Sequence, residues 1–178
     1  MASTYLTRTP SSVGNRKTFT FSAWIKKSDP SANVYFLSQG NSSNNNFAMG
    51  FDSNGKLFYW NYASAFQLRF TTTRVFRDTN AWFHIMLVVD TTQSTEADRV
   101  KLYINGTQET AFDTSTYPSQ NYDTLVNSTT GEFRIGRYVE GTAYFDGLMS
   151  HVHFSDGYAY APTVFGSTDS TTGEWKIN

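Results

Sequence analysis

The chain has 178 residues, a formal net charge of -1 and no cysteine. This length predicts one domain, residues 1–178, large enough to bury a core without disulfides or a structural metal. The near-neutral charge gives no electrostatic basis for binding nucleic acid or an anionic membrane. The longest apolar run, residues 85–89, is far shorter than the ~20 residues that a membrane-spanning helix needs. Without cysteine, thiol chemistry and zinc–thiolate sites are excluded.

Apolar and polar residues alternate with period two along the chain, and no long helical pattern is present. In residues 18–27, Phe19, Phe21, Ala23 and Ile25 share one face. Further strands are predicted at 34–38, 47–52, 56–62, 66–71, 82–90, 99–105, 132–138 and 144–155. Residues 110–131 are predicted as an ordered loop, with a short strand as the alternative, and 161–165 as one helical turn. About ten short strands predict an all-β fold: a two-sheet antiparallel sandwich with its termini close together.

The strongest turn signal is Asn54-Gly55, and Asn105-Gly106 is a second one. Asn-Gly favours a two-residue hairpin turn in which both residues have positive φ. At Asn54-Gly55, the residue pairing across a two-residue turn determines which side chains of the two strands point into the core. It places Trp60 in the core and leaves Tyr59 and Asn61 accessible. The pairs predicted to face the core are Phe51 with Phe58, Met49 with Trp60, and Phe47 with Tyr62.

Four segments form an ordered series of strand and turn motifs. They are Phe-Thr-Phe-Ser-Ala-Trp-Ile-Lys at 19–26, Trp-Phe-His-Ile-Met-Leu-Val-Val-Asp at 82–90, Leu-Tyr-Ile-Asn-Gly at 102–106, and Phe-Arg-Ile-Gly at 133–136 followed by Phe-Asp-Gly-Leu-Met-Ser-His-Val-His-Phe at 145–154. Together they resemble the concanavalin A-like jelly roll of the laminin-G-like kind. The resemblance spans nearly the whole chain, and the order of the four motifs makes it specific.

The two ends carry a narrower pattern. It comprises Tyr-Leu-Thr-Arg-Thr-Pro-Ser-Ser at 5–12, Gly-Asn-Arg-Lys at 14–17, Val-His-Phe-Ser-Asp-Gly at 152–157, Pro-Thr-Val-Phe-Gly at 162–166 and Asp-Ser-Thr-Thr-Gly-Glu-Trp-Lys at 169–176. These segments resemble lectin-like domains in virion structural proteins of tailed bacteriophages. The resemblance implies a non-enzymatic virion surface module, on capsid, tail or fibre, that binds other virion proteins, host surface polysaccharide, or both.

A virion location, after assembly in the host cytoplasm, agrees with the first residues of the chain. They lack the basic and apolar regions of a signal peptide. Weak contacts on a virion gain strongly from repetition. We therefore expect a homo-oligomer, a trimer first of all, or single copies repeated on an icosahedral lattice.

Two other functions stay open, a free-standing carbohydrate-binding lectin and a glycoside hydrolase relative. Glycosidases of the resembled fold carry Glu-x-Asp-x-x-Glu on one strand, which directs the carboxylates into a cleft. The nearest approach here is Glu96-Ala-Asp98, which lies in a predicted loop and lacks the third acid. We therefore expect no catalytic residues and no enzymatic activity.

A sugar site needs an aromatic surface for the C–H face of the ring and nearby amides or hydroxyls, in a largely preformed hollow. The hairpin register proposes Tyr59 and Asn61 as ligand-binding residues. Strand alternation adds Tyr103, whose neighbours Leu102 and Ile104 point inward. It adds Tyr138 as well, opposite the face of residues 133 and 135. The alternative role of such tyrosines is to cover glycine or to fill a subunit contact.

Metal binding has weaker support. His151 and His153 lie two apart on a predicted strand, a spacing at which two imidazoles can chelate a transition metal, but a solvated or interface face is the commoner role. Calcium is common in the resembled family, yet no spacing of the aspartates fixes a site. We predict no metal site and no cofactor, with calcium left open. The available oxygen ligands are those of Asp52, Asp90, Asp98 and Asp146.

Overall fold

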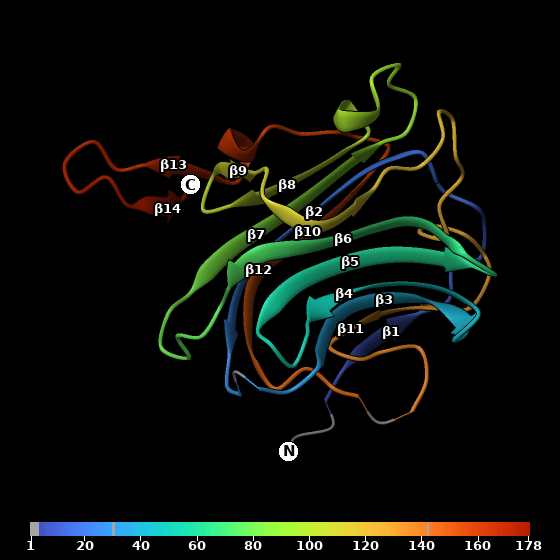
Figure 1. The fold of residues 1–178 in the computed structure, drawn as a ribbon, viewed down its shortest axis with the longest axis horizontal. Helices are drawn as coiled ribbons and strands as arrows, with labels where there is room; N and C mark the ends of the chain where they lie inside the picture. Colours follow the sequence, from blue (N-terminus) through green and yellow to red (C-terminus); the bar gives the residue numbers. More distant parts are fainter. Residues whose placement is uncertain (1–3, 30, 142) are drawn as a thin grey trace.

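The computed structural model describes residues 4–29, 31–141 and 143–178, which fold almost entirely into strands (Figure 1). The strands are β1 (Leu6–Arg8), β2 (Thr18–Lys27), β3 (Val34–Ser42), β4 (Asn45–Phe51), β5 (Lys56–Ala63), β6 (Phe66–Val75), β7 (Phe83–Asp90), β8 (Val100–Ile104), β9 (Thr107–Glu109), β10 (Phe112–Thr116), β11 (Glu132–Ile135), β12 (Gly147–Asp156), β13 (Gly166–Thr168) and β14 (Trp175–Ile177). Two short 3-10 turns, η1 (Glu96–Asp98) and η2 (Pro162–Val164), complete the elements. No helix in these residues is long and apolar enough to cross a membrane.

The strands form a sandwich of two antiparallel sheets. One sheet has seven strands in the order β1-β11-β3-β4-β5-β6-β10, and the other has five in the order β12-β2-β7-β8-β9. A separate hairpin, β13–β14, projects from the body beside the five-stranded sheet (Figure 1). The predicted all-β sandwich is confirmed. For the described residues, the prediction that the two ends of the chain lie close together is wrong, because β1 and the C-terminal hairpin lie at opposite ends of the molecule (Figure 1).

The core between the sheets follows from the alternation in the sequence. Every second side chain of β2 and β7 points inward, as predicted, because one face of each strand is buried against the opposite sheet. These residues are Phe19, Phe21, Ala23 and Ile25 of β2, and Ile85, Leu87 and Val89 of β7. From the seven-stranded sheet, Phe36 stacks against Phe21 with the ring centroids 6.1 Å apart.

The two Asn-Gly turns differ. Asn105 and Gly106 both have positive φ, and Ile104 pairs with Thr107, so the predicted two-residue turn is confirmed there. At Asn54-Gly55 only the glycine has positive φ. Asp52 and Lys56 instead close a three-residue loop, in which Asp52 N–H donates to the Lys56 carbonyl and Gly55 N–H donates to the Asp52 carbonyl, both at 2.9 Å.

The side chain of Asp52 explains the longer loop. Its Oδ1 accepts hydrogen bonds from the backbone N–H of Asn54 and Lys56 at 2.9 and 2.8 Å. An aspartate that caps a turn in this way stabilises a type I turn followed by a left-handed glycine. The β4–β5 register therefore moves by one residue, and every side chain of β5 changes face. The predicted pairing is wrong: Met49 pairs with Tyr59 and Ala48 with Trp60.

Candidate functional site

The structure does not bring the four predicted ligand residues together. Tyr59 is 2% exposed and Asn61 is fully buried, so the prediction that they are accessible is wrong. Tyr103 lies on the outer face of the five-stranded sheet, where it pairs with Met86 of β7. Tyr138 follows β11 and stacks on Tyr35 of the seven-stranded sheet at 4.5 Å between ring centroids. Two of the four residues are thus in the core, and two lie on opposite sides of the sandwich.

Asn61 has a structural role. Its Oδ1 accepts a hydrogen bond from Leu125 N–H at 2.7 Å, and its Nδ2 donates to the hydroxyl of Tyr122 at 3.1 Å. Both partners belong to the segment between β10 and β11. Asn61 therefore anchors this long connection to β5.

Tyr59 fills the core between Phe47 and Phe70. Its hydroxyl has no hydrogen-bond partner among the described residues, and burial raises its pKa well above 10. Removing an unsatisfied buried hydroxyl removes a desolvation cost. We expect Tyr59→Phe to raise the free energy of unfolding by about 1 kcal/mol, measured by urea denaturation. A loss of stability in this variant would mean that the hydroxyl is hydrogen-bonded in solution.

The corrected register places a different set of side chains on the outer face of the seven-stranded sheet, among which Ser38 and Ala48 are fully buried by their neighbours. One row of directly paired residues crosses five strands: Arg134 of β11, Ser38 of β3, Ala48 of β4, Trp60 of β5 and Arg69 of β6. Paired residues of adjacent strands point to the same face of a sheet. The row therefore places small side chains in the centre, with an indole on one side and a guanidinium on the other.

Two further rows of paired residues run parallel to the first, one on each side of it, and have a similar arrangement of side chains. Their central members are glycine or asparagine, and their outer members are mostly aromatic. The rows are Tyr35, Gly50 and Phe58, and Glu132, Gly40, Asn46, Tyr62 and Phe66. Gly50 admits no side chain, because a Cβ there would lie 2.0 Å from the carbonyl oxygen of Val34. We call the set Tyr35, Phe58, Trp60, Tyr62, Phe66 and Tyr138 the aromatic face.

The rings of the aromatic face support one another. Phe58 and Trp60 stack at 4.4 Å with 15° between their planes, and Tyr62 meets Phe66 edge-on at 4.8 Å. The indole of Trp60 is also fixed by a hydrogen bond, since its Nε1–H donates to Oδ1 of Asn46 at 2.8 Å. Trp60 remains partly exposed, and Phe66 is 41% exposed. The face is therefore preformed and open to solvent in part.

Hydrogen-bonding groups border the aromatic face. Nη2 of Arg134 lies 2.9 Å from the carboxylate of Glu132, while its buried Nε has no partner among the described residues. Burial, with smaller effects from Tyr35 and Glu140, raises the pKa of Tyr138 to about 12. Burial also raises the pKa of Tyr35. Both phenols therefore keep their protons at neutral pH and can donate hydrogen bonds.

The other predicted clusters do not form metal sites. No three His, Asp or Glu side chains among the described residues gather closely enough to hold a metal ion. A bulge between Ser150 and His153, where His151 has a φ of 48°, interrupts β12. His151 and His153 are exposed and line a hollow of about 370 Å³ with the buried His84. His84 is hydrogen-bonded to Ser22 and Trp175.

Three of the four aspartates considered for calcium have local roles. Asp52 caps the hairpin loop, and Asp98 pairs with Lys101 at 2.9 Å. Asp90 accepts hydrogen bonds from the hydroxyl of Thr92 and the amide of Gln93, both at 2.6 Å. These contacts engage one carboxylate oxygen each of Asp52 and Asp98, and both carboxylate oxygens of Asp90.

Comparison with known proteins points to one family. A family model described as the concanavalin A-like lectin/glucanases superfamily matches residues 1–164. Domain 4 of AbnA, an extracellular arabinanase of Geobacillus stearothermophilus, is similar in structure (TM-score 0.59, 17% identity, 85% of this chain and 66% of that one). So is CBM40 of the Ruminococcus gnavus IT-sialidase (TM-score 0.57, 14% identity, 85% and 90%).

Domains LG4-5 of the mouse laminin α1 chain are a third structural neighbour (TM-score 0.56, 9% identity, 88% of this chain and 42% of that one). A search of curated protein sequences found no match. At these identities the structural likeness shows the fold alone. The predicted resemblance to the concanavalin A-like and laminin-G-like jelly roll is confirmed.

Proposed function

Because the chain belongs to the concanavalin A-like lectin/glucanases superfamily, we propose that it is a non-catalytic carbohydrate-binding domain. The glycan lies on the aromatic face of the seven-stranded sheet. The observation that carries this proposal is the partly exposed indole of Trp60, which is stacked on Phe58, lies beside the exposed Phe66 and shares a row with Arg134. An indole beside small residues offers a surface for the C–H face of a sugar ring, and the guanidinium and phenols at its border suit the hydroxyl groups.

The structural neighbours support the ligand class. The arabinanase domain is in complex with arabinotriose, and the sialidase CBM40 is bound to α2,3 sialyllactose. Both neighbours are domains of carbohydrate-active enzymes. The structural similarity to this chain covers 66% of the arabinanase domain and 90% of the CBM40 domain.

The carboxylates near the aromatic face suit binding better than glycoside hydrolysis, which needs two acids on either side of the scissile bond. Glu132 is paired with Arg134. Glu140 accepts a hydrogen bond from Ser43 N–H at 2.7 Å. Glu96 and Asp98 lie in η1, just before β8 of the five-stranded sheet, and Asp98 forms an ion pair with Lys101.

Replacing the central aromatic residue tests the proposal. We expect Trp60→Ala to weaken binding to any glycan that the parent selects on an array by at least tenfold, because the partly exposed indole surface is lost. Trp82→Ala is the matched control: Trp82 is 38% exposed just before β7 of the other sheet. The affinity of the Trp82→Ala variant for the same glycan should stay within twofold of that of the parent. Equal losses in the two variants, or a parent that selects no glycan, would contradict the proposal.

The virion setting is a second, separate proposal. Its support is the set of segments at the two ends of the chain that resemble phage virion proteins. The last two of these segments, 162–166 and 169–176, run through η2 and into the hairpin β13–β14. Mass spectrometry of purified virions, with labelled antibody in electron microscopy, should find the protein on the particle surface. Light scattering of the isolated protein should find a homo-oligomer. If the copies are instead brought together only by the icosahedral lattice, the isolated protein should be a monomer. A monomer that is missing from purified particles would overturn this proposal and leave the glycan site untouched.

A further inference from the structure

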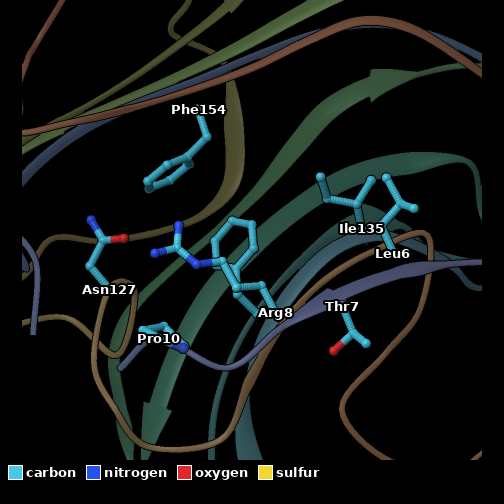
Figure 2. Close-up of a pocket in the computed structure, with 8 residues that line it drawn as sticks. Leu6, Thr7, Arg8, Pro10, Asn127, Ile135 and Phe154 are labelled. Atoms are coloured by element: carbon cyan, nitrogen blue, oxygen red, sulfur yellow. The ribbon is translucent and has the colours of Figure 1, made fainter. Parts of the chain in front are cut away.

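A second hollow lies at the edge of the sandwich, where the two sheets end. Its volume is about 300 Å³ (Figure 2). Apolar side chains from β1, β11 and β12 make most of its wall, and two polar side chains reach it. The residues that define it are Leu6, Arg8, Asn127, Phe133, Ile135 and Phe154. It is distinct from the aromatic face, which lies on the outer side of the seven-stranded sheet.

Strand pairing explains why this hollow is apolar. Leu6 pairs with Ile135 and Arg8 with Phe133, so all four side chains lie on one face of the β1–β11 ladder. That face is the inner one, because Phe133 meets Phe154 of the opposite sheet at 5.0 Å. β1 and β12 are the edge strands of their sheets. The inner face of β1 therefore lies at an opening of the sandwich and not against the packed core. For this reason Leu6 is 67% exposed.

Arg8 is a charge at an inward-facing position. Figure 2 shows its side chain extending into the hollow, toward Asn127 and Phe154. Among the described residues, each ion pair joins a carboxylate to a lysine or to an arginine other than Arg8. The guanidinium therefore offers its donors to whatever enters the hollow.

Asn127 supplies an acceptor beside Arg8. Its Nδ2 donates to the carbonyl of Asn15 at 2.9 Å and to the carboxylate of Asp156 at 3.0 Å. Both amide hydrogens are used, and this fixes the orientation of the side chain. The Oδ1 atom is turned toward the hollow (Figure 2). The hollow thus combines apolar walls with one cation and one hydrogen-bond acceptor.

We propose that this edge hollow binds a small carboxylate with an apolar body, such as a medium-chain fatty acid. The apolar part lies against Leu6, Ile135 and Phe154, and the carboxylate pairs with Arg8. Sites for small molecules are typically hollows of 300 Å³ or more with apolar walls and few polar groups. Guanidinium groups bind carboxylates with two parallel hydrogen bonds. Charge complementarity thus selects an anion over an amine or an alcohol.

Inward-pointing charge on an edge strand has another known role, protection against edge-to-edge association. The two roles predict different results for Arg8→Gln. Loss of a ligand contact weakens anion binding and leaves the chain in its parental oligomeric state. Loss of edge protection promotes association and leaves anion binding unchanged.

Titration of the full chain with octanoate, followed by calorimetry and by NMR shifts, tests the proposal. Octanoate should bind with one-to-one stoichiometry and shift signals of Leu6 and Ile135, and octylammonium should bind at least tenfold more weakly. Arg8→Gln should weaken octanoate binding at least tenfold, while Arg69→Gln, which removes an exposed arginine on the outer face, should not. Leu6→Asp should also weaken it, and Leu6 is exposed enough to be replaced without unfolding the domain.

Three outcomes would overturn the proposal. They are octanoate shifts that do not saturate, equal affinity for octanoate and octylammonium, and an Arg8→Gln variant that associates while its octanoate affinity is unchanged. None of them bears on the glycan site, whose test uses Trp60.

Discussion

Lowering the pH from 7 to 4.5 should reduce the free energy of unfolding by about 2 kcal/mol through His84 alone. His84 is fully buried in β7. Burial, with a smaller effect from the charge of His153, lowers its pKa from 6.5 to about 4. Trp175 of the C-terminal hairpin donates its indole N–H to Nδ1 of His84 at 3.0 Å, and Nε2 lies 2.8 Å from the hydroxyl of Ser22.

These partners fix the tautomer. An indole nitrogen can only donate, so Nδ1 of His84 carries no proton and Nε2 does. A second proton on the imidazole would face the indole N–H and break the bond that holds Trp175. A small residue is also required under the indole, because a Cβ at Gly106 would lie 2.4 Å from the ring of Trp175.

The sign of the effect follows from the direction of the pKa shift. Between pH 6.5 and pH 4, the unfolded chain binds a proton on His84 and the folded chain does not. The stabilisation is therefore complete above pH 6.5 and is lost as the pH falls toward 4. Urea denaturation at pH 7, 5.5 and 4.5 measures it, above the range in which Asp90 and Asp169, whose pKa values are lowered, take up protons.

The variant His84→Gln separates this histidine from other groups. The glutamine amide keeps one donor and one acceptor but does not titrate. We expect its free energy of unfolding to vary less than that of the parent between pH 7 and 4.5. The same pH dependence in parent and variant would show that His84 is not its source.

The sequence predicted the elements that depend on local pattern. Each strand from β2 to β8 lies at or near its predicted position, because alternation requires only that one face be buried. The turn at Asn105-Gly106 and the 3-10 turn after Ala161 were predictable for the same reason. The loop between residues 110 and 131 contains β10, whose Ser and Thr residues give no apolar alternation.

The site depended on a register that local pattern does not determine. Asn54-Gly55 favours a two-residue turn, but Asp52 supplies the hydrogen bonds of a three-residue loop. Alternation could not reveal the error, because both faces of β5 carry aromatic residues. An aspartate two residues before an Asn-Gly pair was the one signal available. The contact between Trp175 and His84, 91 residues apart, left no local signal.

The register makes opposite predictions for two neighbouring residues. Tyr59→Ala should lower the free energy of unfolding by about 3–5 kcal/mol, the usual cost of truncating a buried aromatic residue. Tyr59 packs against Phe47 at 5.2 Å, and its truncation leaves a cavity in the core. Trp60→Ala should cost less, because Trp60 is partly exposed on the outer face, and it should act on glycan binding.

Urea denaturation of the two variants at pH 7 measures the difference. With the observed register, Tyr59→Ala is the less stable of the two by at least 1 kcal/mol, since the cost of truncation rises with the cavity that it leaves. A two-residue turn at Asn54-Gly55 would reverse the order, because Trp60 would then fill the core and Tyr59 would face solvent. The aromatic face would in that case carry Tyr59 in place of Trp60, and the glycan site would have to be sought around Tyr59 and Asn61.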